Sequence, residues 1–260
     1  MGMGEELQAI LGAGQDLERQ MQQVGLVLAK VTNITDEEKL NRVKCMPIGN
    51  EQAEETDWCY VMAPLVGKSC GQFFFPNVND LVVLAYLSGD PHRPMVIGGF
   101  WNTELPPPYT IENGKVYNFS IKTPNGTELL FYDEPKKQKV TLTLPSGTVL
   151  CIDDEAQAVS LKDGKGENAL EMNLKEGTIA LKAKKQLDLS AGETKITLES
   201  GGSLTMAAQK EISMEAAEIA GKGNSKVAVD GAEVKVNATG QLELSASGTA
   251  ALKGATVSIN

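Results

Sequence analysis

The second half of this chain lacks the residues from which globular cores are usually built. The 2 tryptophans, 5 tyrosines and 6 phenylalanines all lie between Trp58 and Tyr132, and the 11 prolines all lie between Pro47 and Pro145. From residue 146 to the end there is neither an aromatic ring nor a proline. Because aromatic side chains supply much of the buried area of ordinary cores, their absence predicts a core too narrow to hold a ring.

The same region repeats a pair of apolar residues separated by one residue. This spacing of two predicts short strands with one buried face, and glycine, serine and asparagine between the pairs predict turns. Successive pairs begin five to ten residues apart, and most begin seven to nine residues apart. The pairs are Leu187/Leu189, Ile196/Leu198, Leu204/Met206, Ile212/Met214, Ala217/Ile219, Val227/Val229, Val234/Val236, Leu242/Leu244, Ala250/Leu252 and Val257/Ile259.

A period near eight residues favours a fibre made of three chains. Two inward residues per repeat cannot close a hydrophobic core within one chain, whereas three copies around a common axis would each contribute one short face per layer. Such a homotrimer would also protect strand edges that otherwise invite aggregation. A β-sandwich of short strands is the alternative, but a sandwich this long would be expected to contain aromatic residues.

Upstream of the repeat, three segments predict turns that join short strands. Two of them, Lys122–Leu129 and Leu144–Leu150, contain Pro-Asn-Gly-Thr and Pro-Ser-Gly-Thr, and the third is Lys162–Asn168. Glycine, proline and asparagine in this arrangement are typical of hairpin turns. We therefore expect the narrow fibre to have a less regular extension on its N-terminal side.

Five strand candidates precede this region, and together they predict a small barrel. Alternating apolar residues within about 80 residues, with turns between them, suit an OB-fold. The glycine-rich Lys162–Asn168 turn is not a phosphate loop, because the required spacing of glycine and lysine is absent. The five strand candidates are Val24–Val31, Arg42–Met46, Trp58–Met62, Asp80–Leu87 and Met95–Gly99.

The barrel segments resemble the OB domain of contractile-tail spike proteins, namely phage baseplate assembly protein V and VgrG-like spikes. The resemblance rests on five motifs that occur in the family's order over about residues 24–105, and the later turns and repeat resemble the family's β-helical spike. The motifs are Arg42-Val43-Lys44-Cys45, Trp58-Cys59-Tyr60-Val61, Gly67-Lys68 with Gly71–Pro76, Asp80–Tyr86, and Gly89–Pro94 with Ile97–Phe100.

The departures from this family predict separate partner proteins. Only 23 residues precede the barrel, where VgrG proteins carry a long hub domain, and the short connector leaves no room for the lysozyme domain of some phage spikes. The resemblance therefore implies a separate hub protein, to which a short N-terminal helix would dock. The residues expected to contact the hub are Leu7, Ile10, Leu11, Leu17 and Met21.

The C-terminal end predicts a second partner. No histidine follows His92, so the chain lacks the residues for the metal-holding tip of some phage spikes. The chain ends on an apolar pair, and we expect its strand edges to be capped by a small PAAR-like tip protein. The residues expected to dock this protein are Ala255, Thr256, Val257, Ser258, Ile259 and Asn260.

Composition excludes several other classes. A net charge of −10 without a basic block disfavours nucleic-acid binding. No apolar run is long enough to span a membrane, and the charged N-terminus lacks the features of a secretory signal. We expect synthesis in the cytoplasm and assembly into a phage-like particle that touches a target envelope only transiently.

The cysteines and the single histidine do not predict a catalytic or metal site. Cys45, Cys59, Cys70 and Cys151 lack zinc-site spacing, so we expect four reduced packing residues and no metal or other cofactor. His92 lies in an Asp-Pro-His-Arg-Pro turn and is expected to be an exposed loop residue.

Two other patterns have functional and structural interpretations. The acidic groups Asp133/Glu134 and Asp153/Asp154/Glu155 could serve glycoside hydrolysis, but solvated turn charges are the better interpretation. The Phe73–Phe75 run could stack bases, but without nearby cations we expect barrel core and inter-subunit packing.

The sequence thus predicts an all-β chain without enzymatic activity. Its function would be that of the trimeric central spike of a contractile phage tail, tailocin or injection system, which pierces the target envelope on sheath contraction. A trimeric receptor-binding fibre is the main alternative, and a tail-associated cell-wall hydrolase is a weaker one. The expected divisions are a hub-docking segment (1–23), an OB domain (24–105), a proline-rich linker (106–116) and a triple-stranded β-helix (117–260).

Overall fold

The computed structural model describes residues 25–49 and 51–259. These residues are all-β apart from a single 3₁₀ turn, η1, at Leu87–Gly89. The chain divides into two units, one that extends to Lys184 and one that begins at Lys185. The expected N-terminal helix over residues 1–23 lies outside the described residues. No helix among the described residues is both long and apolar enough to cross a membrane.

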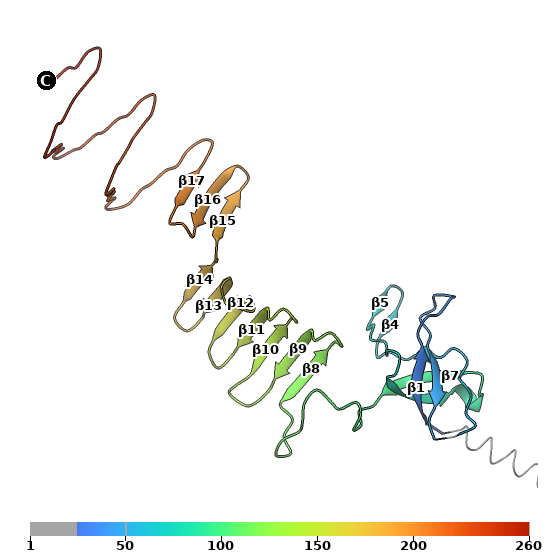
Figure 1. The fold of residues 1–260 in the computed structure, drawn as a ribbon. Helices are drawn as coiled ribbons and strands as arrows, with labels where there is room; N and C mark the ends of the chain where they lie inside the picture. The colour runs from blue at the N-terminus through green and yellow to red at the C-terminus, as the bar shows by residue number, and fades with distance from the viewer. Residues whose placement is uncertain (1–24, 50, 260) are drawn as a thin grey trace, which may run out of the picture. The chain divides into compact units, whose positions relative to one another are not determined.

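The first unit contains a curled five-stranded sheet in the order β2-β1-β6-β7-β3 (Figure 1). The edge strands meet at a bridge between Val43 and Cys59, whose backbone N–H groups donate to each other's carbonyl oxygens at 3.0 and 2.8 Å. This bridge closes the sheet into a barrel, as the sequence predicts. The strands are β1 (Val27–Asn33), β2 (Lys44–Pro47), β3 (Tyr60–Val61), β6 (Leu81–Tyr86) and β7 (Pro94–Gly99).

The barrel has a small core of its own. Alternation along β1 and β6 turns one set of side chains inward, where Val31, Val82 and Leu84 are at most 1% exposed. The other core residues are Ala29, Val43, Cys45, Cys59 and Val96. A short hairpin of β4 (Val66–Gly67) and β5 (Cys70–Gly71) interrupts the barrel strands.

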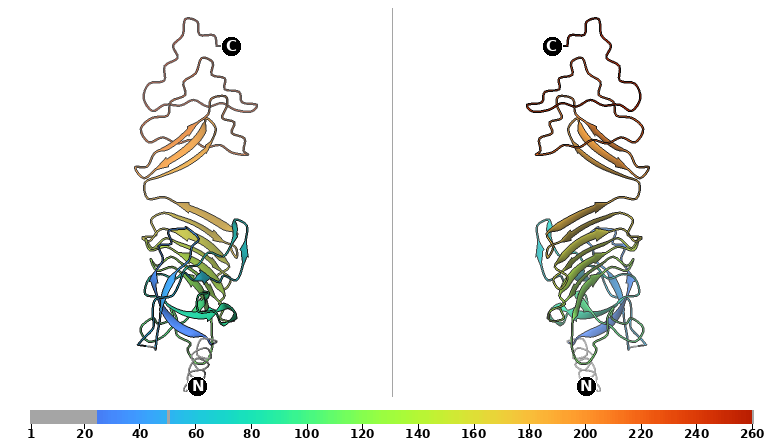
Figure 2. Two further views of the ribbon diagram at one scale, coloured as in Figure 1. Left: turned by 90° about the vertical axis from the view of Figure 1, so that its right-hand side faces the viewer. Right: turned by 90° about the vertical axis from the view of Figure 1, so that its left-hand side faces the viewer.

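After a connecting segment, seven short strands form one antiparallel sheet in which every strand pairs with its neighbour in the chain. Figures 1 and 2 show these strands lying one beside the next in a single layer. The predicted turns at 123–127, 144–148 and 163–168 join consecutive strands of this sheet. The strands are β8 (Asn118–Lys122), β9 (Glu128–Tyr132), β10 (Lys139–Thr143), β11 (Val149–Asp153), β12 (Ala158–Lys162), β13 (Ala169–Asn173) and β14 (Thr178–Lys182).

The second unit begins with a three-stranded antiparallel sheet of β15 (Gln186–Ala191), β16 (Thr194–Glu199) and β17 (Leu204–Ala207). The first three apolar pairs of the repeat lie on these strands. From residue 208 to residue 259 the chain pairs with no other described segment as a strand. The later repeats therefore have apolar pairs at strand spacing but no partner strands among the described residues.

Candidate functional site

The seven-stranded sheet has one continuous apolar face. Directly opposed residues share a face in an antiparallel sheet, and the register sets Phe119 opposite Phe131 and Leu142 opposite Leu150. The same pairing continues through Ile152 and Val159 to the last strand. Two apolar residues per strand form this face: Phe119, Ile121, Leu129, Phe131, Val140, Leu142, Leu150, Ile152, Val159, Leu161, Leu170, Met172, Ile179 and Leu181.

Nothing in the described chain covers this apolar face. None of its residues is buried, and Phe119, Ile152 and Ile179 are 51%, 50% and 67% exposed. An exposed apolar patch of this size on a soluble protein indicates an interaction surface. The face is therefore the strongest candidate for a functional surface of the chain.

The opposite face of the same sheet carries charged side chains that can be hydrated. Lys139 and Asp153 form an ion pair at 3.8 Å, and Lys162 pairs with Glu171 at 3.0 Å. Such exposed pairs add little stability, but they show that charged side chains occupy this side. The sheet is thus amphipathic, with one side in solvent and the other side lacking a cover.

The second unit continues the pattern on its own strands. In β15 and β16, Leu187 opposes Leu198 and Leu189 opposes Ile196, and Met206 of β17 opposes Ile196. The later repeats remain more exposed, up to 80% at Leu244 and 83% at Ile259. The expected tip-docking residues 255–259 are exposed and lie outside any strand, and Asn260 is outside the described residues. The expected hub-docking residues Leu7, Ile10, Leu11, Leu17 and Met21 are also outside them.

The connecting segment is attached to the first hairpin of the sheet. The Tyr109 hydroxyl donates to Glu128 Oε1 at 2.7 Å, and Lys122 Nζ lies 3.4 Å from the same carboxylate. The hydrogen bond from Tyr109, followed by the lysine, lowers the pKa of Glu128. Desolvation and this hydrogen bond raise the pKa of Tyr109 to about 12. The proline-rich segment therefore has at least one fixed point on β9.

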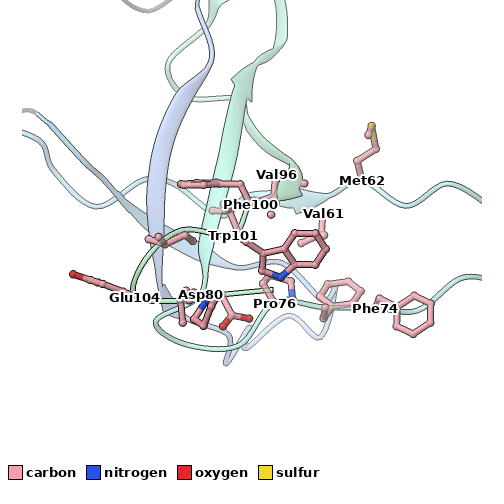
Figure 3. A pocket seen from close by; sticks show the side chains of 16 residues that line it. Val61, Met62, Phe74, Pro76, Asp80, Val96, Phe100, Trp101 and Glu104 are labelled. Atoms are coloured by element: carbon pink, nitrogen blue, oxygen red, sulfur yellow. The ribbon is translucent and has the colours of Figure 1, made fainter. Parts of the chain in front are cut away.

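The barrel carries an aromatic pocket of about 620 Å³ (Figure 3). Phe74, Phe100 and Trp101 line it together with the carboxylates of Asp80 and Glu104. The rings of Phe73 and Phe75 lie 4.6 Å apart by their centroids. Phe73 and Phe74 are 72% and 63% exposed, so the expectation that the Phe73–Phe75 run belongs to the barrel core is wrong. The run lies on the segment that joins the β4–β5 hairpin to β6.

The candidate chemical residues do not assemble into a catalytic site among the described residues. His92 is exposed, as predicted, and its Nδ1 lies 3.0 Å from Asp57 Oδ2. Asp133 and Glu134 lie in the connection after β9, and Asp154 and Glu155 lie in the turn after β11. Asp153 is the last residue of β11, so its interpretation as a turn charge is wrong. The Tyr132 hydroxyl donates to the Glu134 carboxylate, and Lys137 Nζ lies 2.9 Å from Glu134 Oε1. These hydrogen bonds lower the pKa of Glu134, which favours a charged structural carboxylate.

The cysteines follow the prediction only in part. All four are free, and Cys45 and Cys59 are fully buried in the barrel core. A hydrogen bond with Cys59, followed by burial, raises the pKa of the Cys45 thiol, as expected for an unreactive packing residue. Cys151 is half-buried. Cys70 is exposed in the β4–β5 hairpin, so its assignment as a packing residue is wrong.

Comparison with known proteins shows which domain family the barrel matches. Residues 27–101 match the family model of the type VI secretion system and phage-baseplate injector OB domain. The barrel is an injector OB domain. The match covers all five barrel strands and the motifs that carried the resemblance in the sequence.

The chain is also similar to VgrG proteins. The chain is 30% identical over 98 residues to the actin cross-linking toxin VgrG1 of Vibrio cholerae, which covers 36% of this chain and 9% of that protein. It is 26% identical over 110 residues to the type VI secretion system spike protein VgrG1b of Pseudomonas aeruginosa, which covers 35% of this chain and 15% of that protein. The chain therefore resembles VgrG-like spikes, and it spans only a small part of the length of these relatives.

Proposed function

We propose that the chain is the central spike of a contractile injection baseplate and acts as a homotrimer. The observation that carries this proposal is the uncovered apolar face of β8–β14. A single sheet with one apolar side is not stable in water without a cover. Three copies that turn these faces toward a common axis would bury all of them and leave the lysine and glutamate faces in solvent.

The same arrangement explains the second unit. In the repeats after β17, each copy presents one short apolar pair per repeat and has no strand partner within the described chain. Backbone N–H and C=O groups that are removed from water need partners, and two neighbouring copies would supply them. The interior would be lined by valine, isoleucine, leucine, methionine and alanine, as the absence of aromatic residues predicts. The proposed triple-stranded β-helix covers residues 117–260.

The parts then have distinct mechanical roles. The OB domain (24–105) forms a collar, in which the exposed phenylalanines Phe73 and Phe74 pack against a neighbouring copy. The linker (106–116) joins collar to needle. Sheath contraction would drive the needle into a target envelope, and the load would be resisted because unfolding requires separation of three chains. We assign no catalytic role to any residue.

Two further proteins complete the proposed assembly. A hub protein would bind residues 1–23 through Leu7, Ile10, Leu11, Leu17 and Met21, and a PAAR-like protein would cap Ala255–Asn260. The particle would be assembled in the cytoplasm. Co-purification of a cap with assembled particles supports this arrangement, whereas particles that consistently lack any cap count against it.

The decisive experiment on the proposal is the mass of the purified chain by light scattering, combined with SDS gels with and without boiling. We expect a species near three times 27.8 kDa that resists detergent until boiled. A monomer at all concentrations would reject the trimeric needle. A peptidoglycan zymogram of the same sample provides the check on the absence of hydrolase activity.

A further inference from the structure

The β4–β5 hairpin is an exposed arm of the barrel. Every residue from 64 to 75 is exposed, and the apolar side chains of Leu65 and Val66 are 61% and 78% exposed. Lys68 lies in the two-residue turn between the two strands and is the only charged residue from Met62 to Pro76. It forms no ion pair with any residue that the structure describes. The arm therefore presents apolar side chains and one unpaired cation.

The conformation of this arm is fixed by its own backbone. The Gln72 N–H donates to the Leu65 carbonyl at 3.0 Å and closes the base of the hairpin. Gly71 has a φ of +144°, and a Cβ added there would lie 2.5 Å from the same carbonyl oxygen. The two strands therefore approach each other as closely as only glycine permits. An arm that is formed before it binds loses less conformational entropy on binding.

The aromatic pocket of the barrel has the complementary chemistry (Figure 3). Its only charged lining residues are Asp80 and Glu104, and neither carboxylate forms an ion pair within residues 25–49 and 51–259. Asp80 Oδ2 accepts the Asn77 N–H at 2.7 Å, which holds this carboxylate in place. The Trp101 ring is 69% exposed on the pocket wall. Aromatic walls beside two unpaired carboxylates suit an apolar side chain next to a cation.

The arm does not fill the pocket of its own copy. Met62 and Phe74, on either side of the hairpin, line the pocket, but none of residues 63–73 does. Lys68 is three residues beyond Leu65, which corresponds to about 10 Å of strand from the base of the hairpin. Figure 1 shows the hairpin extending away from the five-stranded sheet. Each copy therefore carries two complementary but separate surfaces, which is the requirement for a head-to-tail contact between copies.

We propose that the β4–β5 hairpin of each copy inserts into the aromatic pocket of a neighbouring copy, where Lys68 pairs with Asp80 and Glu104. Leu65 and Val66 then lie against the aromatic walls. This contact rests on the proposed homotrimer and specifies how its collar closes. A head-to-tail contact that closes after three copies forms a ring, in which each hairpin and each pocket is used once.

Cross-linking of the full-length chain tests this contact, because the hairpin carries an exposed cysteine, Cys70. Glu104→Cys adds a second thiol at the pocket. A short bis-maleimide, to which both thiols add, should then join neighbouring copies, and boiled SDS gels should show covalent dimers and trimers. A link within one copy leaves the mass of a single chain, so the gel distinguishes the two cases.

Two variants are the matched controls for the cross-link. Cys70→Ser in the Glu104→Cys background removes the thiol of the hairpin. Glu112→Cys, made in the parent chain, moves the added thiol to another exposed carboxyl position that does not line the pocket. Both should lose the covalent trimer.

Charge reversal tests the ion pair. Trp58→Phe leaves Trp101 as the only tryptophan, so quenching by acrylamide then reports how far the pocket is covered. We expect Lys68→Glu and, separately, Glu104→Lys to raise the quenching constant about twofold, because either change sets like charges against each other. Combining the two in one chain should restore the shielding. Lys30→Glu, on β1 and outside the pocket lining, should leave the quenching unchanged.

Light scattering on the same samples separates this contact from the proposed function. The contact is overturned, and the homotrimer is left standing, if a trimer gives no more cross-linking from Glu104→Cys than from its controls. The same holds if the two charge reversals leave the quenching of a trimer unchanged. A monomer would reject the homotrimer and the contact together.

Discussion

The barrel and the strands that follow it differ in whether their apolar side chains are buried within one chain. Every buried residue of the described chain lies between Ala29 and Val96, within the barrel. The later strands have regular hydrogen-bonded register and two apolar residues each, yet none of their side chains is buried. The first region closes its core within one chain. The second has regular strands from β8 to β17 but no buried side chain, as the proposed assembly of three copies would require.

This difference predicts that an acidic residue on the apolar face will have the largest effect. We expect Leu161→Asp to abolish assembly and leave a monomer in light scattering. An unpaired charge within the proposed trimer core would cost on the order of several kcal/mol per chain. The barrel should remain folded, as reported by the fluorescence of Trp58 and Trp101.

Thr141→Asp is the control for this variant, because Thr141 lies on the opposite face of the same sheet. It should assemble like the parent protein. If Leu161→Asp retained the mass of the parent, the apolar face of β8–β14 would not be the assembly surface, and the comparison between the two regions would fail.

A cavity in the barrel core should produce the reverse pattern. Leu84 is fully buried, and Leu84→Ala removes packing that we expect to cost about 2–5 kcal/mol. The denaturation midpoint of the barrel, followed by the fluorescence of Trp58 and Trp101, should fall sharply. The mass of the assembly should not change, because the proposed needle does not depend on this core. Loss of the trimer in Leu84→Ala would show instead that the two regions fold as one unit.

How much of this could be predicted from sequence differs between the two regions. The barrel strands and three of the six connections within the β8–β14 sheet were predictable, because alternation and turn residues are local signals. For Phe73–Phe75 the sequence predicts barrel core and inter-subunit packing, and the core part is wrong because Phe73 and Phe74 are exposed. A hydrophobic run carries no information about which apolar residues the closed barrel admits. In the sequence, Trp58 and Tyr60 belong to one motif and Arg93 to another, and nothing predicts that they line one pocket. Their proximity follows from β3 pairing with β7, which no local signal encodes.

A smaller effect is expected where two turns of the seven-stranded sheet touch. A Cβ added at Gly164 would lie 2.5 Å from the Ser146 carbonyl oxygen and 3.2 Å from the Gly147 Cα. Because both contacts are with backbone, Gly164→Ala should force the turns apart and destabilise the assembled protein by about 1–3 kcal/mol. Thermal unfolding followed by circular dichroism measures this loss.

Gly201→Ala provides the comparison within the second unit, since an added Cβ there meets nothing within 4 Å. It should leave the melting temperature unchanged or raise it slightly. Equal destabilisation by both substitutions would mean that the spacing of the turns, and therefore the close stacking of consecutive strands, is not what Gly164 protects.

The smallest effect, confined to the barrel, concerns pH. The side-chain hydrogen bond from Arg42 holds the pKa of Asp36 well below its ordinary value. A carboxyl whose pKa is lower in the folded than in the unfolded state stabilises the fold above its unfolded pKa, and this contribution is lost as pH falls through the folded pKa. The barrel should therefore lose urea resistance steadily below about pH 4. Asp36→Asn should be less stable at pH 7 and should lose less on acidification, whereas Glu37→Gln, a neighbouring exposed carboxyl, should keep the parent's pH profile. An unchanged profile in Asp36→Asn would assign the acid sensitivity of the barrel to other carboxylates and remove Asp36 as the group that orders the Arg42 guanidinium.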